Sequence, residues 1–467
     1  MNTSTTDIDE VEMVIKPNGS TRRTSKDEQQ SLNERPTSRG PTKAPEGGWA
    51  WFIVLSAFIN AAFLDGLGAS LGVLLVTLKT YFNEGAGRVS LISSLGLFVF
   101  HSSGPISGSI CEYAGEKKVT MIGAFICCAG LFMSGFMPNV TLLYLTIGFL
   151  MNFGLSLSYL PTFALLGKHF QKRHGLVNGL GYSGYGLGVM GLPPLCQLLI
   201  ERYGWQGTVI ILSGMCGNLF VAAAFLRLQI PMAKSNREND TDSAKRGRLC
   251  MRLTRLLGFH IICMKPGMIG LLLAVGCTGA SYGIFVTFFM QRADEIRIER
   301  MDASLLITAF GAASFLMRLV HGWFIDLRIV SPVCVLIGSI TTWSALLLAF
   351  VFVTNYWGVM TLSVLLGLAS GLTNSLPFVV FKDAIGRKHV ASAFGLCLVS
   401  IGLGSLIGIT IAGALYDMTG TSDVTFYSAA AWGFLHSVIL TTTKIFGNVT
   451  PKADHDRRWR ADDSQRQ

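Results

Sequence analysis

Long apolar stretches recur along the chain and are separated by short polar segments. A helix needs about 20 apolar residues to cross the hydrocarbon core of a membrane. The stretches that are long enough lie at 49–75, 89–111, 119–137, 141–166, 176–200, 208–226, 268–291, 303–325, 330–353, 357–381, 390–415 and 426–445. This pattern predicts an all-α membrane protein with twelve transmembrane helices.

Polar segments divide these spans into two groups. Residues 1–46 are rich in Ser, Thr, Asn and charged residues and lack the apolar region of a signal peptide, so we predict a disordered N-terminal tail. Residues 228–265 form a basic linker. We therefore expect a first six-helix half at 47–227, a second six-helix half at 266–445 and a C-terminal tail at 446–467.

Composition and charge agree with a membrane protein. Hydrophobic residues make up 50% of the chain and charged residues 14%, against about 25% charged residues in soluble proteins. The net charge of +10 comes from basic residues in the linker and in the connections after the second, fourth, eighth and tenth spans. Basic connections mark the cytoplasmic side, so both termini are predicted to be cytoplasmic, and no nucleic-acid partner is indicated. The cysteines lack the spacing of metal ligands, and no metal or cofactor is expected.

Short matches between the two groups of spans recur at one constant offset. The stretch from Gly108 to Glu112 corresponds to the stretch from Gly322 to Asp326, an offset of 214 residues from 108 to 322. The pairs that share this offset are Lys168 and Lys382, Arg173 and Arg387, and Gly181 and Gly395. A parallel repeat of this kind is typical of major facilitator transporters, whose site lies at midplane between two pseudo-symmetric halves.

The stretch from Gly108 to Lys118 also resembles the major facilitator signature between the second and third spans, although Tyr113 and Glu116 replace basic residues of that signature. Glycine permits close helix approach, and an acid near a helix N-terminus can hold two halves together. We therefore predict a cytoplasmic gate, which would consist of Gly108, Glu112, Gly322 and Asp326.

Two further stretches resemble signatures of the monocarboxylate transporter family (solute carrier family 16). They are Glu46-Gly-Gly-Trp-Ala-Trp51 before the first span and the stretch from Lys168 to Gly184 that leads into the fifth. The resemblance extends over residues 45–445 and implies a plasma-membrane secondary transporter, not an enzyme. Such a protein moves small monocarboxylic organic acids by alternating access, often as a proton symporter, and some members need a single-span chaperone partner.

Arg318 matches the arginine with which family members hold the substrate carboxylate. Arginine suits this role because its planar fork stays charged and binds carboxylates bidentately. The alternative is a structural arginine near the inner membrane interface. Ser314 and Ala69 stand where proton-coupled members have an aspartate and a lysine, so the usual charge relay is incomplete here.

Asp65 lies well inside the first span, where an ionised carboxylate costs at least about 2.5 kcal/mol on insertion scales. It is therefore expected to face protein or water. Three interpretations remain open: a proton-coupling group, a group that pairs with a neighbouring helix, or a ligand for a substrate cation. The last would suit a facilitative carrier of zwitterions, such as amino acids or creatine-like or carnitine-like solutes, with Arg318 as the second ligand.

Three polar residues near the middle of their spans are further candidates for substrate contact: Tyr159, Tyr282 and Asn374. Hydrogen bonds between helices would explain each of them equally well. A function of another class also fits the fold, namely a non-transporting membrane sensor or scaffold. The retained charge at Asp65 argues against it, because a scaffold has little reason to keep a buried carboxylate.

Overall fold

The computed structural model describes residues 48–170, 174–226, 267–326, 331–377, 380–381 and 390–446. Every long element within these ranges is a helix, which confirms the predicted all-α fold class for this part of the chain. The helices are α2 (Ala50–Phe82), α3 (Ala86–Ser102), α4 (Gly104–Ala114), α5 (Glu116–Ser134), α6 (Val140–Leu143), the π-helix η1 (Tyr144–Met151), α7 (Asn152–His169), α8 (His174–Met215), α9 (Asn218–Phe225), α12 (Gly267–Glu295), α13 (Arg300–Asp326), α14 (Pro332–Phe352), α15 (Tyr356–Thr373), α17 (Val390–Thr419) and α18 (Asp423–Phe446).

A described helix overlaps each of the predicted spans. Eleven stretches are long and apolar enough to cross a membrane. The longest, Leu176–Phe225, contains two predicted spans, 176–200 and 208–226. Between them the backbone of Gly204 has φ 68° and ψ 177°, a conformation that glycine adopts readily and that turns the chain. The eleven stretches are therefore consistent with twelve spans, whereas both predicted tails and the basic linker lie outside the described residues.

Two helix ends differ from the predicted boundaries for local reasons. The first helix, α2, continues past the end of the apolar run to Phe82 and stops where Asn83 turns left-handed at φ 52°. Conversely, α15 stops at Thr373, before the predicted span end at 381. Asn374 and Ser375 then form a turn, and the chain is helical again at Leu376 and Pro377.

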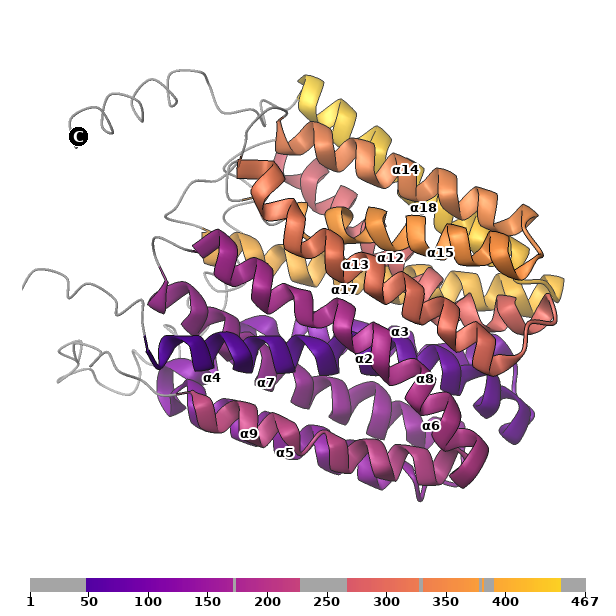
Figure 1. Cartoon of the computed structure of the whole chain (residues 1–467), viewed down its shortest axis with the longest axis horizontal. Coiled ribbons are helices and arrows are strands. Elements are labelled where there is room, and N and C mark those ends of the chain that lie inside the picture. The colour runs from indigo at the N-terminus through magenta and orange to yellow at the C-terminus, as the bar shows by residue number, and fades with distance from the viewer. Residues whose placement is uncertain are drawn as a thin grey trace, which may run out of the picture. The chain divides into compact units, whose positions relative to one another are not determined.

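Among the described helices, the two halves pack against each other mainly through α8 with α13, α3 with α17 and α2 with α12. In Figure 1 the first half runs from indigo to magenta, and the second from rose through orange to yellow. Glycine permits the close approach of α8 and α13. A Cβ atom on Gly186 would lie 2.6 Å from the Cα of Phe315, and one on Gly311 would lie 2.6 Å from the backbone nitrogen of Met190. A side chain at either position would push the halves apart.

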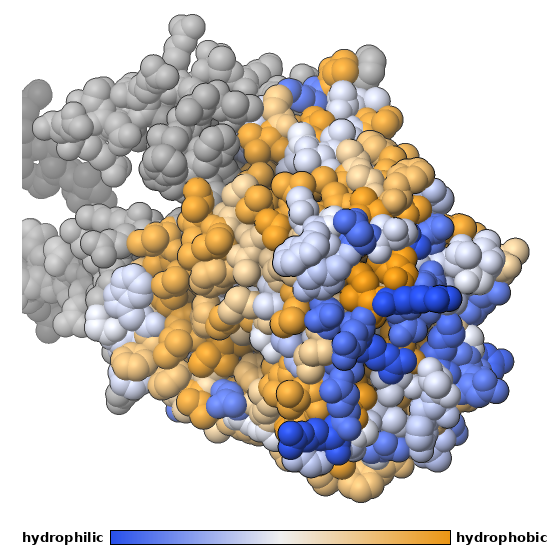
Figure 2. All heavy atoms as spheres, turned by 45° about the vertical axis from the view of Figure 1, so that its right-hand side comes forward, coloured by the Kyte–Doolittle hydropathy of each residue, from blue (hydrophilic) through white to orange (hydrophobic). Residues whose placement is uncertain are grey.

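Large apolar side chains cover the sides of the bundle. Figure 2 shows a broad apolar surface next to a region where polar residues gather. Among the exposed side chains are Phe125, Phe132, Phe352, Trp357 and Ile445. An apolar surface of this extent is a liability in water and suits the hydrocarbon of a membrane.

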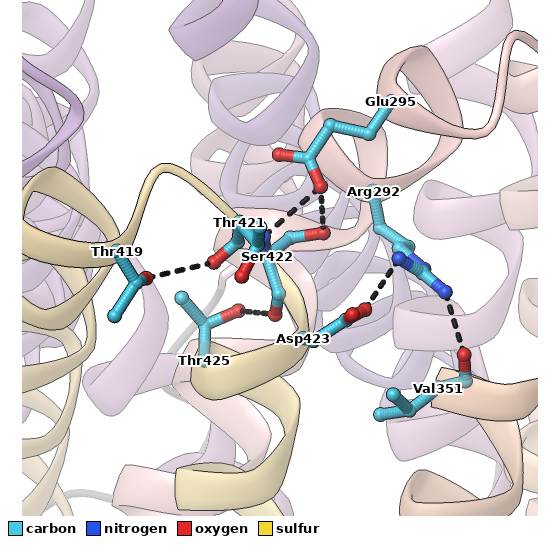
Figure 3. Close-up of polar contacts among 8 residues, drawn as sticks. All are labelled: Arg292, Glu295, Val351, Thr419, Thr421, Ser422, Asp423 and Thr425. Atoms are coloured by element: carbon cyan, nitrogen blue, oxygen red, sulfur yellow. Dashed lines mark hydrogen bonds and ion pairs between the residues drawn. The ribbon is translucent and has the colours of Figure 1, made fainter.

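A polar network braces one end of the second half (Figure 3). Arg292 near the end of α12 is buried and donates to the Asp423 carboxylate in the first turn of α18 and to the Val351 carbonyl of α14. Glu295 accepts hydrogen bonds from the backbone N–H of Ser422, at 3.0 Å, and from its hydroxyl group. These contacts fix the ends of α12, α14 and α18 relative to one another.

Candidate functional site

Arg318 lies on α13 between the two halves and is only 4% exposed. Its Nε donates to the Ser314 hydroxyl, one helical turn earlier, at 3.3 Å. Its guanidinium carbon lies 4.9 Å from the centre of the Tyr185 ring, which α8 supplies from the opposite half. A guanidinium over an aromatic face gains about 2 kcal/mol or more when the pair is desolvated. The arginine is therefore directed into the interface between the halves.

Ser314 connects Arg318 to a third helix. Its hydroxyl accepts a hydrogen bond from the Ser370 hydroxyl of α15 at 3.2 Å, in addition to the one from Arg318. Both serines are buried. Through Ser314, the Arg318 side chain is thus connected to a hydroxyl group of α15.

Asp65 points from α2 toward the second half. Its carboxylate accepts a hydrogen bond from the Tyr282 hydroxyl of α12 at 3.4 Å, which is long for such a bond. Asp65 also lies within electrostatic range of Arg318. The side chain is partly accessible, as expected for a charged group beside an internal site. An acid of the first half and a base of the second half therefore share one region.

Tyr159, Tyr182 and Tyr185 form a group that we call the tyrosine cluster. The Tyr185 hydroxyl of α8 donates to the Tyr159 hydroxyl of α7. The rings of Tyr182 and Tyr185 stack with their centres 5.8 Å apart and their planes 10° from parallel. Phe163 packs against two rings of the cluster. The centre of its ring lies 4.5 Å from that of Tyr159 and 4.8 Å from that of Tyr182. The cluster is a packed aromatic wall on the first-half side of Arg318.

Asn374 follows the end of α15 and is connected to Arg318 through other residues. It is partly buried at the C-terminal end of α15, and its backbone N–H bonds to the Ser370 carbonyl at 3.0 Å. Ser370 in turn contacts Ser314 beside Arg318. The structure thus shows two groups of contacts: Arg318 is joined to Tyr159 through Tyr185, and Asp65 contacts Tyr282. Asp65 and Arg318 lie within electrostatic range of each other, and Asn374 is connected to the first group through Ser370 and Ser314.

A second set of polar contacts joins the halves at the face where α2 ends. The Lys79 ammonium of α2 donates to the Tyr416 hydroxyl of α17 at 3.1 Å and lies 4.5 Å from the centre of that ring. Gln291 of α12 donates to the same hydroxyl at 2.9 Å. The Gly87 N–H of α3 donates to the Asp417 carboxylate of α17 at 2.9 Å. The two halves are therefore closed against each other at this face.

Comparison with known proteins agrees with this architecture. The family model described as Major Facilitator Superfamily matches residues 53–294 and 271–461. The chain belongs to the major facilitator superfamily. The predicted pseudo-symmetric halves, with a site between them, are the arrangement of this superfamily.

Curated relatives of this major facilitator protein are named monocarboxylate transporters. Monocarboxylate transporter 13 of Rattus norvegicus is 29% identical over 408 residues, which cover 87% of this chain and 91% of the relative. Monocarboxylate transporter 4 of Gallus gallus is 29% identical over 81% of this chain and 80% of its own. Monocarboxylate transporter 12 of Xenopus laevis is 26% identical over 90% of this chain and 93% of its own. These matches confirm the resemblance that the sequence motifs indicate.

The predicted gate of this superfamily member is only partly described. Gly108 lies within α4, and a Cβ atom there would meet no described atom within 4 Å. Among the described atoms, therefore, no close neighbour requires glycine at this position. The side chain of Glu112 lies outside the described residues, and so do the surroundings of Gly322 and Asp326. The gate remains a prediction.

Tyr182 and Tyr185 were not among the residues expected from the sequence. Tyr182 lies within the motif that leads into the fifth span, and Tyr185 follows that motif directly. The two tyrosines are three residues apart, which places them on one face of a helix. Buried phenol groups need a hydrogen-bond partner, so two tyrosines on one helix face indicate a polar neighbour. The three-residue spacing of Tyr182 and Tyr185 is the feature of the sequence from which this pair could have been predicted.

Proposed function

We propose that this major facilitator protein is a secondary transporter that moves small monocarboxylic organic acids across the membrane by alternating access. The observation that carries the proposal is Arg318, a buried guanidinium at the contact between the two halves. Charged residues inside membrane proteins are costly and mark substrate or ion pathways. The curated relatives that bear the name monocarboxylate transporter support the same solute class.

In this mechanism Arg318 binds the substrate carboxylate with the planar fork of its guanidinium. The halves then rock about the site, so that the substrate is released at the other face. The contact of Lys79 with Tyr416 breaks when the site opens toward the face where α2 ends. The solute gradient drives transport, and Asp65 is the group that would carry a coupled proton. No cofactor takes part.

A second candidate function is the facilitated transport of zwitterions. It is favoured by the position of Asp65, which shares one region with Arg318 and carries the opposite charge. A solute with an amine and a carboxylate, such as an amino acid or a creatine-like or carnitine-like compound, would satisfy both groups.

We also propose a place and an orientation in the cell. The helices and the superfamily establish a multi-pass membrane protein. The basic connections favour cytoplasmic tails, which makes the face of the Lys79 contact extracellular. From the resemblance to the monocarboxylate transporter family, we propose the plasma membrane as the location and a single-span chaperone as a candidate partner.

The test is the uptake of a labelled monocarboxylate by cells that express the protein. Arg318→Ala should abolish uptake while the amount of protein at the surface stays constant. Arg300→Ala is the matched control, because Arg300 is an exposed arginine at an end of the same helix. Uptake that survives Arg318→Ala would remove this residue from the site and overturn the proposal.

A further inference from the structure

The contact between Arg318 and Tyr185 joins the two halves of the bundle. Arg318 belongs to α13 of the second half, and Tyr185 belongs to α8 of the first. Asp65 shows the converse arrangement, because its partner Tyr282 lies on α12 of the second half. Each of the two charges is therefore contacted by a tyrosine of the opposite half.

Tyr185 is itself fixed within the first half. Its hydroxyl donates to Tyr159 of α7, and its ring stacks on that of Tyr182 one helical turn earlier. Both neighbours are part of the first half, and Tyr159 is buried. The ring face that Tyr185 offers to Arg318 therefore has a position set by α7 and α8 rather than by the helix of the arginine.

Arg318 has a different support within its own half. The Ser314 hydroxyl accepts a hydrogen bond from the Nε of Arg318. The same hydroxyl accepts a second hydrogen bond from Ser370 of α15. An arginine side chain carries about 2 kcal/mol of rotamer entropy, so each contact that restricts the guanidinium lowers the cost of holding it in one orientation. A second contact of this kind places the guanidinium carbon over the face of the Tyr185 ring, at 4.9 Å from its centre.

We propose that Tyr185 is a positioning residue that orients the Arg318 guanidinium from the opposite half, so that high affinity for a carboxylate depends on how the halves are placed. The inference rests on the proposed function, in which Arg318 binds the substrate. The ring suits the task because an aromatic face attracts a guanidinium without supplying a carboxylate that would compete with the substrate. When the halves rock, the ring moves away with the first half, and affinity changes with conformation.

The first experiment separates the ring face from the hydroxyl group. Uptake of a labelled monocarboxylate is measured over a range of concentrations for Tyr185→Phe and Tyr185→Leu, with rates normalised to surface protein. We expect Tyr185→Leu to raise KM about tenfold, since loss of the contact costs on the order of 1–2 kcal/mol. Tyr185→Phe keeps the ring and should keep KM within about twofold. The matched control is Tyr427→Leu, an exposed tyrosine of α18.

Two results would overturn the inference. An unchanged KM in Tyr185→Leu would show that the ring does not orient Arg318. An equal increase in both variants would assign the effect to the hydroxyl group instead. If Arg318→Ala abolishes uptake and Tyr185→Leu does not change it, the proposed function stands and only this inference fails.

A second measurement does not depend on the substrate. The apparent melting temperature of the purified full chain in detergent is measured for Tyr185→Leu, Arg318→Met and the double variant. Contacting residues give non-additive effects, so the double variant should lose less than the sum of the single losses. Additive losses would contradict the contact, and the pair Tyr427→Leu with Arg318→Met should be additive.

Discussion

The Lys79 ammonium and the Tyr416 hydroxyl lie 3.1 Å apart and belong to opposite halves of the bundle. Lys79 is at the end of the first helix, and Tyr416 also accepts a hydrogen bond from Gln291. Because a transporter must open each face in turn, a contact of this kind stabilises one conformation at the expense of the other.

Loss of the Tyr416 side chain should open this face. Tyr416→Leu removes the common hydrogen-bond acceptor of Lys79 and Gln291. The free energy that favours the closed conformation should fall by about 1 kcal/mol. We therefore expect a cysteine placed at Ala69 to react about fivefold faster with an impermeant maleimide. Ala69 is buried on α2, one turn beyond Asp65. The control is Tyr427→Leu, and equal labelling rates in both proteins would contradict the role of the contact.

Replacement of Arg318 by lysine should weaken transport without removing the charge. Lysine has no planar fork and cannot keep the bond from Nε to Ser314, so KM for a monocarboxylate should rise about tenfold or more. The concentration dependence of uptake measures this change, with Arg300→Lys as the control. A KM equal to that of the unaltered protein would show that charge alone suffices.

Ser314→Asp should make uptake depend on pH. A carboxylate beside Nε of Arg318 would compete with the substrate when ionised and cease to compete when protonated. Uptake by this variant should therefore be low at mildly alkaline pH and rise as the pH falls. The comparison is with Ser314→Asn, which adds similar bulk without a titratable group. A parallel pH profile in the two variants would argue against the competition.

The two candidate functions differ in what Asp65→Asn should do. If Asp65 carries a proton, the variant loses stimulation by an imposed pH gradient for every solute. If Asp65 binds a substrate cation, uptake falls about tenfold for solutes that bear an amine and is kept for simple monocarboxylates. Paired uptake of the two solute classes, with and without a pH gradient, distinguishes these outcomes. Full activity under all four conditions would leave Asp65 as a packing group.

Close packing of α2 on α8 should make one glycine sensitive to substitution. A Cβ atom on Gly188 would collide with the carbonyl oxygen of Ala62, whereas one on Gly191 would meet no described atom within 4 Å. Gly188→Ala should lower stability by about 1–3 kcal/mol, and Gly191→Ala should not. Thermal unfolding in detergent and the amount of protein at the surface measure this difference. Equal losses in both variants would contradict the close approach.

Much of the fold could be predicted because hydrophobic length is a local property. The apolar stretch around Asp65 and each of the later apolar stretches predict a transmembrane span. The motif that begins at Glu46 indicates the family without any knowledge of the contacts. The turn at Gly204 and the early end of α15 depend on backbone geometry, which hydropathy does not register.

The site was harder to predict because it is made by contacts between distant segments. Arg318 and Asp65 were candidates because charges are rare inside spans. The role of Tyr185 as the neighbour of Arg318 follows only when α8 packs against α13. Gly108, in contrast, has no close neighbour among the described atoms, although its motif led us to expect one.

The braced end formed by Arg292, Asp423 and Glu295 has a consequence for motion. It joins α12 to α14 and α18, and the loop that carries Ser422 follows directly after the helix that carries Tyr416. These contacts tie α12, α14 and α18 to one another at this end, next to the helix that carries Tyr416. A displacement that begins where Tyr416 meets Lys79 is therefore expected to move these three helices together rather than one at a time.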